Sequence, residues 1–95
     1  MRVVVLSDTA LQQLKRLHKN TRGFIKEGIR KHLAESDPLQ RTRNKFRRLS
    51  EYAEYELRLD RWRVFYRVRE GAVEIVLIGE KQGDSLFIGG EEFFL

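Results

Sequence analysis

Residues 55–81, YELRLDRWRVFYRVREGAVEIVLIGEK, decide the fold of this chain. Apolar and charged side chains alternate through 55–68 with a period of two residues, which is typical of strands that have one buried face. The pairs Asp60-Arg61 and Glu70-Gly71 interrupt the alternation, and both suit a tight hairpin turn. The stretch therefore predicts three consecutive antiparallel strands, of which the third is the most apolar and the most central.

Upstream of this stretch, the pattern predicts a strand and then two helices. Residues 2–6 (RVVVL) form a continuous apolar run, which favours a central strand buried on both faces. Ser7 or Asp8 can cap the following helix, because a short oxygen side chain accepts a free backbone N–H. Apolar residues at helical spacing predict this helix up to about residue 20 and a second helix over 21–34.

The remaining segments complete a two-layer plan. Residues 39–50 carry five basic residues and predict a short basic strand in their second half, and residues 86–88 predict another strand. We expect an α+β fold, with the N-terminal strand and the helical hairpin packed on one face of a mainly antiparallel sheet of four to five strands. Residues 1–95 are expected to form a single domain, and Gly28 is expected to let the two helices approach closely.

Charge is distributed unevenly along the chain. Residues 1–69 hold 18 Lys and Arg against 8 Asp and Glu, whereas residues 70–95 hold one Lys against six acids. A basic body favours a polyanionic partner, most simply nucleic acid, although an acidic protein or a merely solvated basic surface fits the same composition. The chain has no Cys, so disulfides, thiol nucleophiles and the usual structural zinc sites are excluded.

The apolar segments are too short for a membrane span or a signal peptide. We therefore expect a cytoplasmic protein that needs no membrane. With no Cys and only two His, we also expect no metal ion and no cofactor.

Alternation also predicts which side chains face the helices and which face away. The side chains expected to face the helices are Tyr55, Leu57, Leu59, Trp62, Val64, Tyr66 and Val68. The opposite side, called the outer face below, is expected to carry Glu56, Arg58, Arg63, Phe65, Arg67 and Arg69, bordered by Lys45, Arg47 and Arg48. Arginine forks suit phosphate oxygens and an exposed Phe65 ring could stack on an unpaired base, which together favour RNA binding. The predicted RNA-binding residues are Lys45, Arg47, Arg48, Phe65 and Arg67. Cross-strand salt bridging of the same charges is the alternative.

The segments 55–68 and 73–81 resemble the C-terminal half of the RelE/ParE superfamily of bacterial toxins. That superfamily has a Tyr-x-hydrophobic-Arg/Lys strand, a short turn and an aromatic-Arg-hydrophobic-hydrophobic-Tyr strand, followed by a valine-rich strand that ends in Ile-Gly-basic-basic. The resemblance is specific over 55–81 and follows the order of elements over nearly the whole chain. It implies a RelE/ParE-like fold and the toxin of a type II toxin–antitoxin system, held silent by a cognate antitoxin protein.

RelE-like toxins cut messenger RNA in the ribosomal A site without a metal, so the resemblance implies a ribosome-dependent mRNA endoribonuclease that inhibits translation. The ribosome and mRNA would then be its partners. Arg63 stands at the position of the family's central phosphate-binding arginine, and Arg58 and Lys81 stand at further basic positions, so these three are the predicted catalytic residues. Fixed cations of this kind stabilise the extra negative charge of a phosphate under attack.

Three positions depart from the RelE-like pattern. Glu56 and Glu80 stand where basic residues are common, and Phe87 stands near the catalytic tyrosine of efficient members. A Phe ring has no ionisable proton, and a carboxylate beside arginines is a poor base. The catalytic set is therefore atypical, and two alternatives remain open: a gyrase-inhibiting toxin of the ParE kind, and a non-catalytic module that binds RNA or an antitoxin.

Overall fold

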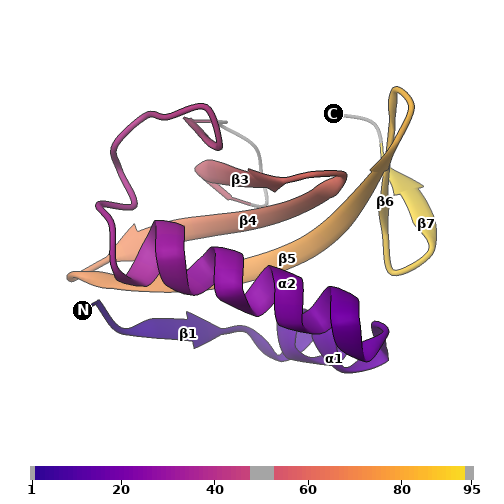
Figure 1. Cartoon of the computed structure of the whole chain (residues 1–95), viewed down its shortest axis with the longest axis horizontal. Coiled ribbons are helices and arrows are strands. Elements are labelled where there is room, and N and C mark those ends of the chain that lie inside the picture. Colours follow the sequence, from indigo (N-terminus) through magenta and orange to yellow (C-terminus); the bar gives the residue numbers. More distant parts are fainter. Residues whose placement is uncertain (1, 48–52, 94–95) are drawn as a thin grey trace.

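The computed structural model describes residues 2–47 and 53–93, and it confirms the predicted α+β two-layer fold. The elements follow in the order β1 (Val4–Leu6), α1 (Asp8–Arg16), α2 (Lys19–Ile29), a π-helical turn (Arg30–Ala34), β2 (Lys45–Arg47), β3 (Tyr55–Leu59), β4 (Trp62–Arg69), β5 (Ala72–Gln82), β6 (Ser85–Ile88) and β7 (Glu91–Phe93). Figure 1 shows α2 lying across the sheet, with β1 along one side and the β6–β7 hairpin at the far end. None of the helices in these residues is long and apolar enough to cross a membrane.

The two helices meet at a break that falls earlier than predicted. The side-chain oxygen of Ser7 accepts a hydrogen bond from the backbone N–H of Ala10 at 3.0 Å, so Ser7 rather than Asp8 caps α1. Leu17 is already extended, with φ −80° and ψ 153°. The ring of His18 then accepts a hydrogen bond from a backbone N–H at the start of α2. A side-chain cap therefore begins each helix of the hairpin.

The sheet contains seven strands in the described part of the chain, rather than the predicted four to five. Its order is β2-β3-β4-β5-β6-β7, with antiparallel pairing throughout, and β1 pairs with β5 in parallel. Because β5 is long, its first half pairs with β1 and its last three residues pair with β6. Both predicted hairpins are confirmed: Asp60 has φ 58° in one turn, and Glu70 and Gly71 have φ 52° and 79° in the other.

Strand β1 is an edge strand, so the prediction that it is central was wrong. Within residues 2–47 and 53–93 it pairs with β5 and with no other strand. Val3 is 65% exposed and Val5 is 50% exposed. Val4 and Leu6 point the other way and pack against the main core. The run of valines thus reflects β propensity, with burial on one face only.

The main core lies between the helices and the sheet, and its composition confirms the predicted inward face. Leu57, Leu59, Val64 and Tyr66 are buried in it, while Tyr55, Trp62 and Val68 pack against it. A Cβ atom on Gly28 would lie 2.5 Å from the Cδ1 atom of Leu59. Gly28 therefore allows α2 to approach β3, and the prediction of a helix–helix contact at Gly28 was wrong.

A second, smaller hydrophobic cluster covers part of the outer face. It consists of Ala53, Phe65, Leu86 and Ile88, with Val76 and Leu77 packed beside them. Leu86 and Ile88 come from β6, in the hairpin at the far end of the sheet (Figure 1). The outer face is therefore partly closed by the chain's own C-terminal hairpin.

Candidate functional site

Register brings the three residues predicted for catalysis to the outer face. Arg58 of β3 lies directly opposite Arg63 of β4, and Arg63 lies opposite Gly79 of β5. Because side chains alternate along a strand, Lys81 falls on the same face as Gly79. Lys81 is half-buried, and its backbone N–H donates to the carbonyl oxygen of Arg61 at 2.7 Å. The catalytic role of these residues stays a prediction.

Carboxylates from neighbouring positions offset most of the arginine charge on the outer face. The ion pairs there are Arg58–Glu56 at 2.9 Å, Arg67–Glu74 at 2.6 Å and Arg69–Glu54 at 2.5 Å. Arg63 turns back toward the β3–β4 turn, where it donates to the carbonyl oxygens of Asp60 at 2.6 Å and Trp62 at 3.0 Å. This face is therefore largely a network of internal pairs, which was the alternative that the alternation left open.

The pair formed by Glu56 and Arg58 differs from the others in its burial. Glu56 is only 1% exposed, whereas the side chain of Arg58 is 42% exposed. In the register, Glu56 lies between Phe46 of β2 and Phe65 of β4. The guanidinium carbon of Arg58 lies 3.9 Å from the centroid of the Phe46 ring, which is a cation–π distance. One edge and one face of this guanidinium are thus already occupied.

Lys45 does not border the outer face, so its predicted placement beside the other basic residues was wrong. It is 3% exposed and lies opposite Leu57, which faces the helices. Its Nζ atom donates to the carbonyl oxygens of His32 at 3.2 Å and Asp37 at 2.8 Å. Burial lowers the pKa of this ammonium group. Lys45 therefore stabilises the end of the helical region, where free carbonyls attract cations.

The prediction that Phe65 is an exposed ring able to stack on a base was also wrong. It points to the outer face, as its alternation requires, but it is only 3% exposed because Leu86 and Ile88 of β6 pack against it. Of the other two predicted RNA-binding residues near β2, Arg47 pairs with Tyr55 in the register, and Arg48 lies outside the described residues. RNA contact by these two arginines stays a prediction.

The tyrosine and histidine side chains of the described residues lie away from the outer face. The hydroxyl of Tyr66 is buried on the helix side and donates to the carbonyl oxygen of Pro38 at 2.6 Å, and burial raises its pKa. His18 and His32 lie on the helical side of the chain. Phe87 lines a pocket with Trp62 on that same side. In the described part of the chain, no three His, Asp or Glu residues lie close enough together to hold a metal ion.

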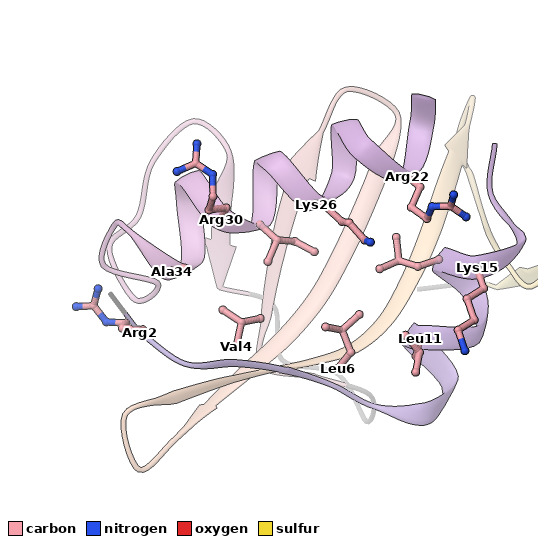
Figure 2. A pocket seen from close by; sticks show the side chains of 11 residues that line it. Arg2, Val4, Leu6, Leu11, Lys15, Arg22, Lys26, Arg30 and Ala34 are labelled. Atoms are coloured by element: carbon pink, nitrogen blue, oxygen red, sulfur yellow. The ribbon is translucent and has the colours of Figure 1, made fainter. Parts of the chain in front are cut away.

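A second basic surface, which the sequence reasoning missed, lies between β1 and the two helices. This basic groove has a volume of about 680 Å³. Its floor consists of the apolar residues Val4, Leu6, Leu11, Leu14, Ile29 and Ala34. Its rim consists of the basic residues Arg2, Lys15, Arg22, Lys26 and Arg30. Figure 2 shows Val4 and Leu6 of β1 pointing toward α2, along which Arg22, Lys26 and Arg30 follow one another.

Most cations on this rim lack an acidic partner. Arg30 pairs with Glu27 and Glu35, and Arg2 donates to a backbone carbonyl. The other three, Lys15, Arg22 and Lys26, form no ion pair within residues 2–47 and 53–93. A sequence signal did exist, because Arg22, Lys26 and Arg30 are spaced at four-residue intervals beside the apolar stripe of the same helix.

Residues 4–84 match the model of the family described as the ParE toxin of type II toxin–antitoxin system, parDE. The chain belongs to the ParE toxin family. No curated protein sequence matches it. The match begins at the first residue of β1 and ends just before β6, so the hairpin that covers Phe65 lies outside the matched segment.

Membership of the ParE toxin family confirms the resemblance to RelE/ParE toxins. The chain is thus the toxin of a type II toxin–antitoxin system, and an antitoxin protein is its partner.

Proposed function

We propose that this ParE-family toxin acts by binding a macromolecular target, as the gyrase-inhibiting toxins of the superfamily do, rather than by cleaving RNA. The observation that carries the proposal is the pairing of the outer-face arginines. Arg58 and Arg67, which would bind phosphate in a nuclease, already bind Glu56 and Glu74. An arginine held by a carboxylate has less charge to offer to a cleaved phosphate.

The pairing of outer-face carboxylates in the described residues supports the same proposal. Cleavage by a ribose hydroxyl requires one group that takes a proton and another that gives one, each within hydrogen-bond reach of the phosphate. Three carboxylates near the outer-face arginines, Glu54, Glu56 and Glu74, each form an ion pair with an arginine. Each of these three carboxylates is thus already engaged by a neighbouring side chain.

Two assays on the purified toxin test this proposal. Gyrase should lose its ability to supercoil relaxed plasmid DNA when the toxin is added, and transcripts mapped after induction without antitoxin should remain intact. Growth arrest accompanied by cleaved transcripts, with unaffected gyrase, would contradict the proposal.

RNA cleavage is the second candidate function, and one observation favours it. Arg58 and Arg63 lie directly opposite each other with Lys81 on the same face, as a phosphate-binding set requires. If the toxin is a nuclease, Arg63→Ala should reduce ribosome-dependent cleavage by about a hundredfold. Arg69→Ala, which removes an outer-face arginine near the end of β4, should leave the cleavage rate within about twofold and serves as the matched control.

We further propose that the antitoxin places an acidic amphipathic helix in the basic groove. The apolar floor would receive the apolar face of such a helix, and the cationic rim would pair with its carboxylates. Arg22 and Arg30 are eight residues apart, or about 12 Å along a helix, which matches about two turns of a bound helix. The unpaired state of Lys15, Arg22 and Lys26 supports an acidic occupant, because their charge has no internal compensation among the described residues.

Charge reversal on the groove rim tests this docking mode. Lys26→Glu should weaken binding of the antitoxin encoded by the adjacent gene by about tenfold or more, since it replaces attraction with repulsion. Lys19→Glu makes the same charge change at the exposed start of α2, outside the groove, and should change the affinity by less than about twofold. Equal affinities of the two variants, measured by calorimetry, would contradict docking in the groove.

A further inference from the structure

We infer that Glu56 is a specificity-determining residue that excludes nucleic acid from the outer face. Its buried carboxylate cancels the charge of Arg58 at a place where two opposed arginines would otherwise bind the phosphates of single-stranded RNA. This inference rests on the proposed function and deepens it, since it gives a physical reason why a toxin of this fold would not bind RNA.

The starting point is the direct opposition of Arg58 and Arg63 across β3 and β4. Side chains opposite each other in an antiparallel pair have Cβ atoms about 5 Å apart, and the Arg63 guanidinium extends from there toward the β3–β4 turn, where it donates to the carbonyl oxygens of Asp60 and Trp62. Such a pair becomes favourable when an anion lies between or beside the two guanidiniums. Here the anion is internal, since the Oε2 atom of Glu56 lies 2.9 Å from the Nε atom of Arg58.

The Arg58 guanidinium is also fixed in orientation. Its Nε–H donates to Glu56, and the Phe46 ring lies against one of its faces at 3.9 Å. Arginine binds a phosphate best with two parallel N–H groups of its fork. With Nε engaged by Glu56, the side of the fork that includes Nε is unavailable to a ligand.

Burial makes the Glu56 charge more effective than an ordinary surface carboxylate. At 1% exposure it is shielded from water and salt, so its repulsion of an approaching phosphate is weakly screened. Arg67 and Glu74 form a comparable pair on the same face, but their side chains are 41% and 37% exposed. Water and ions screen that pair, so Glu74 is a matched reference with the same chemistry and lower burial.

The test measures binding of a 5′-labelled single-stranded RNA of mixed sequence by fluorescence anisotropy, in about 0.1 M salt, where charge effects remain visible. Glu56→Gln keeps the size of the side chain and an acceptor for Arg58, but removes the charge. We expect Glu56→Gln to bind this RNA about tenfold more tightly than the wild type, with a steeper salt dependence by about one phosphate contact. Glu74→Gln makes the same change in net charge and should tighten binding by less than about threefold.

A double variant tests whether the uncompensated charge of Arg58 causes the tighter RNA binding expected of Glu56→Gln. Glu56→Gln combined with Arg58→Gln restores the net charge of the wild type and should restore its weak RNA binding. Equal tightening by Glu56→Gln and Glu74→Gln would overturn the inference, since it would show only a general effect of net charge. A tenfold gain that persists in the double variant would overturn it as well.

A further variant keeps the inference testable if Glu56→Gln fails to fold, as judged by circular dichroism. Arg58→Gln should weaken RNA binding more than Arg67→Gln does, because it takes this partner from the weakly screened Glu56 carboxylate, whereas Glu74 is screened by solvent. Equal losses of affinity in the two variants would overturn the inference. Failure of the proposed function has a different signature: transcript cleavage by the wild type contradicts that proposal, whereas these affinity ratios decide the role of Glu56.

Discussion

On the outer face, Arg58 and Arg67 form ion pairs with carboxylates carried by the same strand or by the next one. In the basic groove, the cations of α2 follow one another at four-residue spacing, and only Arg30 has acidic partners within residues 2–47 and 53–93. Both surfaces are rich in arginine and lysine, but the first compensates its charge internally and the second does so only in part. A count of basic residues therefore does not identify the surface that binds a partner.

The difference comes from the local geometry of strands and helices. A two-residue repeat places Glu56 and Arg58 on the same side of β3, so an acid and a base become neighbours. A four-residue repeat places Arg22, Lys26 and Arg30 on one side of α2, so like charges become neighbours. The first pattern compensates its own charge, whereas the second would gain stability from the acidic antitoxin helix that we propose.

The largest expected effect concerns the burial of the ion pairs on the outer face. Arg58→Ala should lower the free energy of unfolding by about 3 kcal/mol, because it removes a partner from the buried Glu56 carboxylate. Arg67→Ala should lower it by less than about 1 kcal/mol, because the Arg67–Glu74 pair is exposed to solvent. Urea unfolding at pH 7 measures both, and similar losses would show that burial does not distinguish the pairs.

Lys45 provides the next test, because it was expected to be a surface cation and is a buried one. Lys45→Met should lower the free energy of unfolding by about 2 kcal/mol, since the carbonyl oxygens of His32 and Asp37 lose their donor. Lys26→Met, on the groove rim, should change it by less than about 0.5 kcal/mol. If thermal or urea unfolding gave the opposite ranking, the structural role of Lys45 would be refuted.

A smaller effect of opposite sign is expected on the groove rim. Lys26→Glu should raise the free energy of unfolding by about 0.5 kcal/mol, because it places an acid four residues from both Arg22 and Arg30. The gain should shrink in high salt, where such pairs are screened. If Lys26→Glu is more stable and yet binds the antitoxin less well, then the rim cations serve binding and reduce the stability of the free toxin. A loss of stability in Lys26→Glu would argue against repulsion between like charges on the rim.

The smallest effect concerns pH. Burial, together with Lys31 and Lys45, lowers the pKa of His32 below its ordinary value of about 6.5. The unfolded chain therefore takes up the proton first as pH falls, so stability is full above pH about 6.5 and declines below it. His32→Gln should flatten this decline in urea unfolding measured between pH 7.5 and 5.5. An unchanged slope would assign the decline to other groups.

Much of the fold was readable from local pattern. The alternation over 55–68 correctly predicted which side chains of β3 and β4 face the helices, and the Asp60-Arg61 and Glu70-Gly71 turns were correctly placed. The candidate site was less predictable. The alternation of side chains within 55–68 does not fix the register of β2, which is why Lys45 was predicted on the wrong face of the sheet. No local sequence pattern indicates that β6 covers Phe65.

By itself, the sequence determined the order of the elements, the inward face of the sheet and the family, because all three depend on residues that are close together in the chain. Only the tertiary structure decided which cations are available to a partner. That outcome depends on contacts between distant segments: Arg67 with Glu74 across a hairpin, Lys45 with the end of the helical region, and β1 with α2 around the groove. Charge is a property of a residue, whereas its compensation depends on which neighbours the fold places beside it.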